Sequence, residues 1–298
     1  IILNPNAEKE YTIKQDDTLI IIRNPNVLIE LKLDYSNVVN NTIINPKPYH
    51  FIKQNHNFVI IGYGKNIDRL LEEFNKIIDP QSNVVLLFDD KYKSKINLKK
   101  IQDNKDVAYT LSHHFYHEFN EFKELIESLD KGNDIDAMIL LPNEFLSKKE
   151  KDNESIFTLQ NLKHLEKENK RDYNITVDLV EMSNQNIIEH MNIADVIVSD
   201  KFSSELIFQY ATHRDIKVVY DELFSTKGDE IFSIPITHYI SSFKEPTNFY
   251  TLSKSALEKE HIAIGYKHNN AVVILTDNKE TLIDFNENDH LIVIAKGH

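Results

Sequence analysis

The 298-residue chain contains no cysteine, no tryptophan and only six glycines. Without cysteine it can form no disulfide and offers no thiolate as nucleophile or metal ligand. No apolar run approaches the roughly 20 residues that a membrane helix needs, and the strongest runs, NVVLLF and FVIIGYG, have the length of strands. The first residues lack the pattern of a signal peptide. The composition is that of an ordinary globular chain.

The chain has fewer basic than acidic residues. The chain has 34 Lys and Arg against 47 Asp and Glu, which gives a formal net charge of −13. Nucleic-acid backbones and anionic lipid surfaces bind proteins through clustered positive charge, so the sequence predicts neither as a partner. The charge permits cations as ligands. The length allows roughly two domains.

The first and last segments of the chain are similar to each other when Ile1 is aligned with Val273 without a gap. The identical positions are Ile2, Leu3, Asn6, Glu8, Asp17, Leu19, Ile20 and Ile22, which recur as Ile274, Leu275, Asn278, Glu280, Asp289, Leu291, Ile292 and Ile294. Two strands and a turn cannot bury a core alone. We therefore expect residues 1–25 to be the C-terminal hairpin of a preceding domain, so that the chain is a fragment. We expect residues 26–56, rich in Asn and Pro, to be a linker.

From residue 57 onward, strand-length apolar segments alternate with amphipathic helices. The strand segments are continuously apolar, which is typical of a parallel sheet covered on both faces. Residues 57–215 are therefore predicted to form a Rossmann-like, doubly wound α/β domain. Shorter strands and one helix follow, and they predict a small α+β lobe over residues 216–298. Residues 143–155 are predicted to be a charged loop.

The turn GYGKNI after the first strand of this domain begins like a dinucleotide-binding fingerprint. Gly62 and Gly64 fill the first two glycine positions, but Ile67 stands where a third glycine would allow close helix–strand packing. Asp68 and Glu72 in the first helical turns would repel a pyrophosphate. The sequence therefore does not predict a bound nucleotide, and a tight turn without a ligand is the simpler interpretation.

Other polar residues give weak indications of a site. Asp89 and Asp90 end the second strand, where a ribose-binding acid would lie. With Gly62 and Gly64 they are the candidate ligand-binding residues. The segment SHHFYHEF has spacings compatible with a metal at a helix start, although a surface cluster is the simpler interpretation. Its members are His113, His114, His117, Glu118 and Glu121. No Ser-His-Asp arrangement, GxxxxGK loop or HExxH motif occurs, so the sequence predicts no enzyme.

Several segments in order resemble the second regulator-of-conductance (RCK) domain of CASTOR and POLLUX type ion channels. They are FVIIGYGKNIDRLLEEF, NVVLLFDD, ADVIVSDKFSSELIFQYA, DELFSTKGDEI, HIAIGYK and FNENDHLIVIA. The similarity runs from about Asn57 to the end, and residues 1–25 then resemble the end of a first RCK domain. The Lys- and Asn-rich composition departs from that of the plant members, so the conducted ion and the ligand do not transfer.

The resemblance implies a fold and a function. RCK domains have a Rossmann-like N-lobe, a helical crossover and a C-lobe, and they assemble in homo-oligomeric rings at the cytoplasmic face of a membrane. A ligand shifts the ring and gates a cation pore, often a potassium pore, which would lie upstream in the same chain. We therefore expect a dimer or higher oligomer in solution. The apolar residues expected at the interface are Leu206, Ile207, Phe208, Val218, Val219, Leu223 and Phe224.

Calcium is the ligand that the resemblance suggests. In calcium-gated relatives an aspartate in an Ala-Asp-x-x-x-Ser strand motif helps to bind the ion, and ADVIVS places Asp195 there. Further candidate ligands, chosen by sequence proximity, are Asp200, Glu205, Asp221 and Glu222. The alternative is that Asp195 only accepts backbone hydrogen bonds.

Two other functions stay open. One is a regulatory RCK module of a Trk- or antiporter-like transporter, and the other is a soluble NAD-dependent Rossmann enzyme. Ile67 and the lack of a catalytic constellation count against the enzyme.

Overall fold

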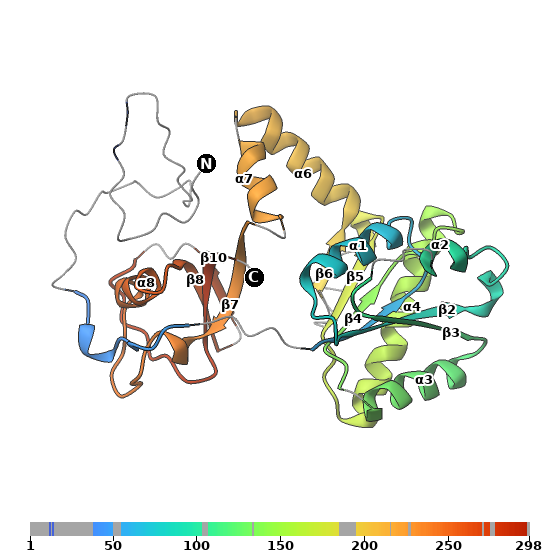
Figure 1. The fold of residues 1–298 in the computed structure, drawn as a ribbon, viewed down its shortest axis with the longest axis horizontal. Coiled ribbons are helices and arrows are strands. Elements are labelled where there is room, and N and C mark those ends of the chain that lie inside the picture. Colours follow the sequence, from blue (N-terminus) through green and yellow to red (C-terminus); the bar gives the residue numbers. More distant parts are fainter. Residues whose placement is uncertain are drawn as a thin grey trace. The chain divides into compact units, whose positions relative to one another are not determined.

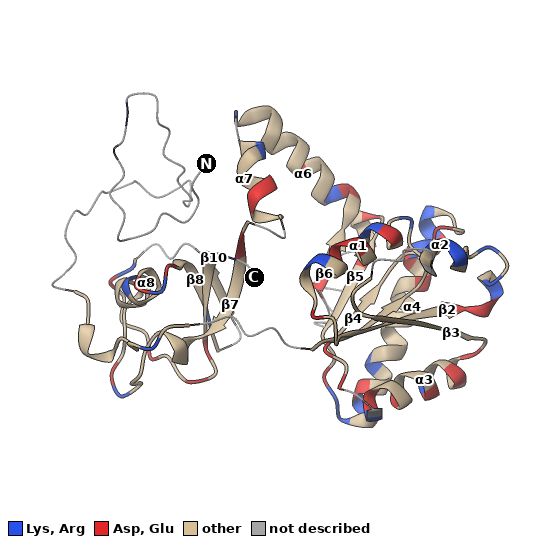
Figure 2. Cartoon of the chain, in the orientation of Figure 1, with Lys and Arg blue, Asp and Glu red and all other residues tan. Residues whose placement is uncertain are grey.

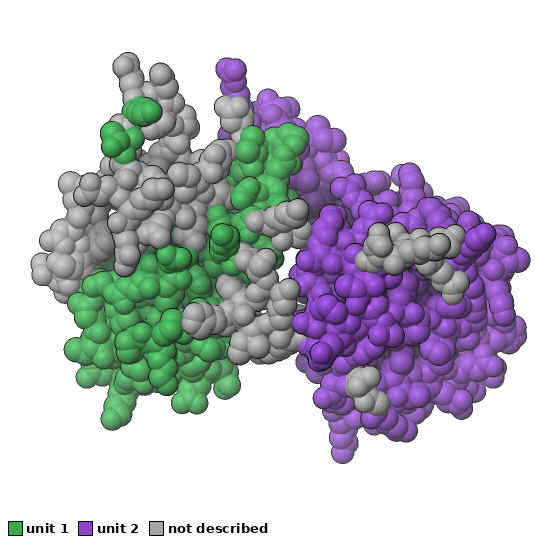
Figure 3. Space-filling model, viewed as in Figure 1, with its two compact units in different colours: residues 1–51, 215–298 green, residues 52–214 purple. Residues whose placement is uncertain are grey.

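The computed structural model describes residues 12, 14, 38–49, 55–102, 107–132, 134–184, 195–214, 216–225, 228–269, 271–274 and 278–296. The chain forms two compact units, coloured separately in Figure 3. Unit 1 comprises residues 1–51 and 215–298, and unit 2 comprises residues 52–214. None of the helices that the structure describes is both long and apolar enough to cross a membrane.

Unit 2 contains a six-stranded sheet (Figure 1). Its strands are β1 (Asn57–Ile61), β2 (Asn83–Asp89), β3 (Thr110–Tyr116), β4 (Ala137–Leu140), β5 (Ile175–Leu179) and β6 (Asp195–Val198). The strand order is β3-β2-β1-β4-β5-β6, and every neighbouring pair is parallel. The predicted Rossmann-like fold is therefore confirmed.

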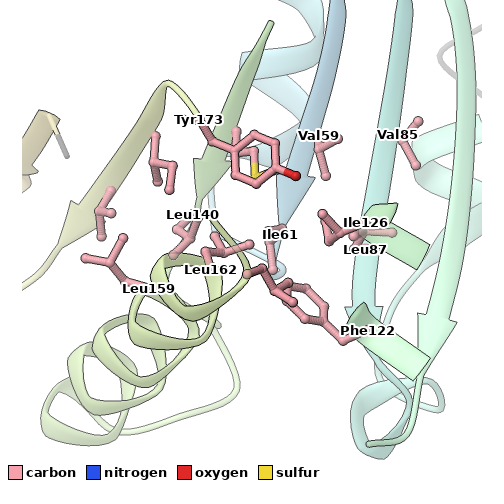
Figure 4. Packing of buried hydrophobic residues seen from close by; sticks show 14 of the residues in the cluster. Val59, Ile61, Val85, Leu87, Phe122, Ile126, Leu140, Leu159, Leu162 and Tyr173 are labelled. Atoms are coloured by element: carbon pink, nitrogen blue, oxygen red, sulfur yellow. The ribbon is translucent and has the colours of Figure 1, made fainter. Parts of the chain in front are cut away.

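Among the described residues, four helices cover the two faces of this sheet. They are α1 (Ile67–Ile77), α2 (Leu98–Gln102), α3 (Phe119–Gly132) and α4 (Lys148–Asn169). Helix α6 (Ser199–Thr212) follows β6, and none of its residues is buried. Because side chains alternate along a strand, β1 presents Ile60 to one face and Val59 and Ile61 to the other. Ile60 packs in a cluster with residues of α1 and α2. Val59 and Ile61 pack with residues of α3 and α4, and Figure 4 shows Phe122, Leu159 and Leu162 converging on these strands.

One local prediction in unit 2 was wrong, and one alternative is excluded. The charged segment 143–155 is not all loop, because α4 begins at Lys148. Ser147 precedes the helix, and Glu150 reaches back to accept its backbone N–H at 3.0 Å, which stabilises the first turn. His113 and His114 lie in β3 and not at a helix start. Successive strand residues point to opposite faces, so these two histidines cannot share a metal.

Unit 1 contains a four-stranded antiparallel sheet with the order β7-β10-β8-β9. Its elements are α7 (Ile216–Leu223), β7 (Asp229–Pro235), α8 (Phe249–Leu257), β8 (Ile262–His268), β9 (Ala271–Ile274) and β10 (His290–Lys296). One face of the sheet and α8 enclose a core that includes Leu252, Tyr266 and Leu291. The predicted small α+β lobe is confirmed.

Part of the expected linker belongs to this folded unit. Ile43 is buried in the core of unit 1, and Ile44 forms an antiparallel bridge with Ile240. Asn40 donates its backbone N–H to Thr251 Oγ1 at 3.0 Å. Residues 38–49 therefore contribute to the stability of unit 1 and do not only connect two domains.

The second copy of the repeat does not form the hairpin that was expected for the first copy, residues 1–25. Its two strands, β9 and β10, both pair with β8, which lies between them. The first copy lies outside the described residues apart from positions 12 and 14.

Candidate functional site

The carboxyl edge of the parallel sheet carries the predicted ligand-binding residues. Gly62 follows β1 with φ +94°, and a Cβ on it would lie 2.3 Å from the carbonyl oxygen of Leu141. A Cβ on Gly64 would lie 3.1 Å from the Leu141 Cβ. The two glycines thus allow the turn after β1 to pack closely on the chain leaving β4. This packing explains them without a ligand.

Aromatic side chains pack next to the ends of β1 and β4, the strands between which open α/β sheets bind nucleotides. Tyr63 stacks on Phe145 with ring centroids 5.4 Å apart, and Tyr92 lies 5.7 Å from the same ring. Tyr63 is only 6% exposed, and Ile67 at the start of α1 is 1% exposed. That no dinucleotide binds stays a prediction, which titration with NADH would test.

Asp89 takes part in an ionic network at the end of β2. Its carboxylate lies 2.5 Å from Lys91 Nζ, and Lys91 Nζ also donates to Glu154 Oε1 on α4 at 2.8 Å. The Tyr92 hydroxyl donates to the same Glu154 oxygen at 3.2 Å. Burial alone would lower the pKa of Lys91, but its hydrogen bonds to Asp89 and Glu154 raise that pKa above its ordinary value. Lys91 therefore stays charged.

Asp90 pairs with the first residue after β3. His117 Nδ1 lies 3.0 and 3.1 Å from the two carboxylate oxygens of Asp90. This hydrogen bond raises the pKa of His117 above its ordinary value. The backbone N–H of His117 donates to Glu121 at 2.7 Å. Of the predicted histidine cluster, the structure thus pairs only His117 with a carboxylate.

A cavity of about 180 Å³ opens beside this network, on the side of the sheet covered by α3 and α4. We call it the edge cavity. Its lining includes Asp89, Lys91, Tyr116, Phe119, Glu154 and Phe157. Burial raises the pKa of the Tyr116 hydroxyl well above its ordinary value, and the charges of Asp89 and Glu154 raise it further. Tyr116 therefore stays neutral and can donate a hydrogen bond.

The sequence singled out Asp89, His117 and Glu118 of the edge cavity but missed Lys91 and Glu154. Glu154 fell in the segment predicted to be loop, although Ser147 and Glu150 have the spacing of a capping box that begins a helix. Extending α4 to Lys148 places Glu154 one to two helical turns into the helix. The pairing of Lys91 with Glu154, 63 residues apart, has no signal in a single sequence. Figure 2 shows acidic residues giving way to basic ones along the connection after β2.

Two of the predicted calcium ligands, Asp195 and Asp200, lie apart within unit 2. Asp195 is exposed at the first position of β6, whereas Asp200 follows the strand in α6. A four-residue strand spans roughly 10 Å. Asp195 therefore lies at the amino end of β6, and Asp200 lies beyond its carboxyl end. Asp200 pairs with Lys148 at 3.5 Å.

The remaining calcium candidates lie on two helices. Glu205 is exposed on α6, while Asp221 and Glu222 belong to α7 in the other unit. Asp221 forms an ion pair with Lys217, one turn earlier. Among the described residues, no three His, Asp or Glu side chains come together as a metal site. Calcium binding at Asp195 stays a prediction, and it would need ligands other than Asp200.

Comparison with known proteins points to one group. The probable ion channel POLLUX of Arabidopsis thaliana is 28% identical over 123 residues, which is 40% of this chain and 15% of that protein. The ion channel POLLUX of Lotus japonicus is 25% identical over 125 residues, covering 41% of this chain and 14% of that protein. The chain therefore matches about one seventh of the length of these relatives. The predicted resemblance to POLLUX-type channels is confirmed.

Other comparisons add less. The probable ion channel POLLUX of Oryza sativa subsp. japonica is 22% identical over 125 residues, covering 41% of this chain and 13% of that protein. No protein-family model matches the chain. A solved structure titled GsuK Channel aligns with 82% of this chain and 38% of that chain at 12% identity. Its TM-score of 0.29 is too low to support a conclusion.

Proposed function

We propose that this chain is a regulatory RCK domain of an ion channel related to the POLLUX channels. The observation that carries the proposal is the sequence similarity to three POLLUX proteins. The doubly wound sheet with a separate small lobe is the architecture that an RCK domain would have. In this assignment residues 57–215 are the N-lobe, residues 216–298 are the crossover and C-lobe, and residues 1–25 end a preceding RCK domain.

The proposed mechanism is a two-state gating ring at the cytoplasmic face of a membrane. A ligand shifts such an assembly only if it binds the two states with different affinity. A cation pore, with potassium as the leading candidate ion, would be in the same parent protein. The role needs no catalysis, and Ile67 at the third glycine position of the fingerprint counts against an NAD-dependent enzyme.

Helix α6 supports the proposed assembly into a ring. None of the 14 residues of α6 is buried, although it carries large apolar side chains. Ile207 is 68% exposed and Phe208 is 61% exposed. Exposed apolar surface of this kind is typical of a protein interface. A neighbouring RCK domain would cover it.

The parent protein's membrane topology tests this assignment. We expect two membrane helices with a pore loop between them, upstream of the region described here. Mapping accessible positions along the full-length parent by cysteine labelling would reveal that arrangement. A many-helix transporter would instead favour the Trk- or antiporter-like alternative, and a parent without membrane segments would overturn both.

A further inference from the structure

The edge cavity combines negative charge with aromatic walls. Three carboxylates line it, from Asp89, Glu118 and Glu154, and the basic side chains in the lining are Lys91 and His117. Among the described residues, both hydrogen bonds to the Glu154 carboxylate end on Oε1. Its Oε2 is therefore available to a further donor. The lining thus favours a ligand that carries positive charge and N–H donors.

Aromatic rings form much of the remaining wall. Tyr116, Phe119 and Phe122 line the cavity from β3 and α3, and Phe157 lines it from α4. Phe122 is only 3% exposed, whereas Phe157 is 63% exposed. A ligand with an apolar body would cover Phe157 and gain the free energy of removing that ring from water. An inorganic cation would leave these rings uncovered.

The same edge of the sheet already holds ammonium groups over aromatic rings. Lys91 Nζ lies 4.8 Å from the centre of the Tyr92 ring, and Lys93 Nζ lies 5.0 Å from that of Phe115. Lys95 Nζ lies 5.6 Å from the centre of the Phe145 ring. The ammonium group of Lys91 contacts both kinds of partner, the carboxylates of Asp89 and Glu154 and the ring of Tyr92. The local chemistry is therefore suited to an ammonium ion.

We propose that the edge cavity binds a small organic ammonium ion, with its ammonium group against Glu154 and Asp89 and its apolar body between Tyr116, Phe119 and Phe157. The volume of about 180 Å³ sets the size, since a protein cavity of about 150 Å³ holds one benzene molecule. A small free amine fits this volume. The proposal rests on the proposed function, because it names the class of ligand that the regulatory domain would sense.

Lys91 is an internal competitor for the same carboxylates. Its Nζ lies within 2.8 Å of both Asp89 and Glu154. An incoming ammonium ion must share these oxygens with Lys91 or displace it. Removing the lysine charge should therefore raise the affinity for an ammonium ion, whereas removing a carboxylate should lower it. A general loss of structure would lower the affinity in both variants, so the two variants together distinguish it from a direct effect on binding.

The test is calorimetric titration of the whole chain with benzylamine, at a pH where the amine is protonated. We expect saturable binding, weakened about tenfold by Glu154→Gln and strengthened severalfold by Lys91→Gln. Phe157→Leu should weaken binding by about two- to fivefold, because it removes a ring but keeps an apolar side chain. Glu124→Gln on α3, an exposed carboxylate outside the cavity lining, should leave the affinity unchanged.

Benzyl alcohol and benzoate have nearly the same shape and supply the charge controls. We expect little binding of either. Equal affinity for all three compounds, no binding of benzylamine to wild type or Lys91→Gln, or no effect of Glu154→Gln would each overturn the proposal. The titration needs no pore. If the chain binds the amine but its parent protein passes no current, the binding site is supported and the channel function is rejected. If the parent protein passes a gated current but the chain binds no amine, the channel function is supported and the binding site is rejected.

Discussion

At the scale of single residues, Gly62 has the strictest geometric requirement. Its φ of +94° is costly for any residue with a Cβ, and that Cβ would contact the Leu141 carbonyl at 2.3 Å. We predict that Gly62→Ala lowers the free energy of unfolding of unit 2 by at least about 2 kcal/mol. Urea unfolding followed by circular dichroism measures this. Gly64→Ala is the matched control, because its nearest neighbour is a side-chain atom at 3.1 Å. An equal or larger loss at Gly64 would contradict the account.

Asp289, the aspartate before the last strand of the repeat, has a structural role in unit 1. Its carboxylate accepts hydrogen bonds from His268 Nδ1 and the Asn286 backbone N–H, both at 2.8 Å, and from the Asn269 backbone N–H at 3.2 Å. Asp289 is only 3% exposed. Burial would raise its pKa, but these hydrogen bonds lower it below the ordinary value of 3.8.

The sign of the Asp289 shift gives a pH dependence. Since the folded-state pKa is depressed, the carboxylate stabilises the fold above about pH 4, and that contribution is lost as the pH falls through the folded-state pKa. Asp289→Asn should therefore cost roughly 1–3 kcal/mol at pH 7 and progressively less below pH 4. Unfolding curves at several pH values, with the exposed Asp284→Asn as control, measure this difference. A cost that does not change with pH would show that the charge is unimportant.

Calcium binding at Asp195 stays a separate residue-scale prediction. An ion that binds only the folded chain must raise the midpoint of thermal unfolding. We expect an upward shift in millimolar calcium that is smaller in Asp195→Asn. Absence of a shift, or an equal shift in the variant, would remove Asp195 from any calcium site.

At the scale of elements, the parallel strands were predictable and some boundaries were not. Continuous apolar runs at β1, β2 and β4 indicated buried strands, because both faces of a parallel sheet are covered. The start of α4 was readable from Ser147 and Glu150 but was missed, since the intervening lysines resemble a solvated loop. The placement of β8 between β9 and β10 was not predictable. Strand order depends on long-range packing that a turn sequence does not encode.

Helix α6 gives the element-scale prediction. Val219, one of the residues expected at an interface, is buried at 8% exposure, whereas Phe208 on α6 is 61% exposed. We predict that Phe208→Asp shifts the chain toward monomer, because a carboxylate at an apolar contact is costly. Its free energy of unfolding should change by less than about 0.5 kcal/mol, as for other surface substitutions.

Sedimentation velocity over a range of concentrations checks the α6 prediction. Ser203→Asp introduces the same charge at another exposed position of α6 and should have a smaller effect. A wild-type chain that stays strictly monomeric at high concentration would remove α6 as an interface.

At the scale of the whole molecule, unit 1 is assembled from two distant parts of the chain. Residues 38–49 pack with residues beyond 230, while residues 52–214 form the other unit between them. Composition could not show this, since Asn- and Pro-rich segments are typical of linkers. The fold class was predictable because the pattern of apolar residues within each strand and helix can be recognised from neighbouring residues in the sequence. The edge cavity was not, because its charged residues come from β2 and α4, far apart in sequence.

The most direct test of the central claim is single-channel recording of the full-length parent protein in planar bilayers. If this chain is a regulatory domain separate from the pore, Phe208→Asp should change the open probability and leave the unitary conductance unchanged. Ser203→Asp should change neither by much. Ion currents with altered open probability in Phe208→Asp alone are the result that the account predicts. A parent that passes no current, or a variant whose conductance changes while its open probability does not, would contradict it.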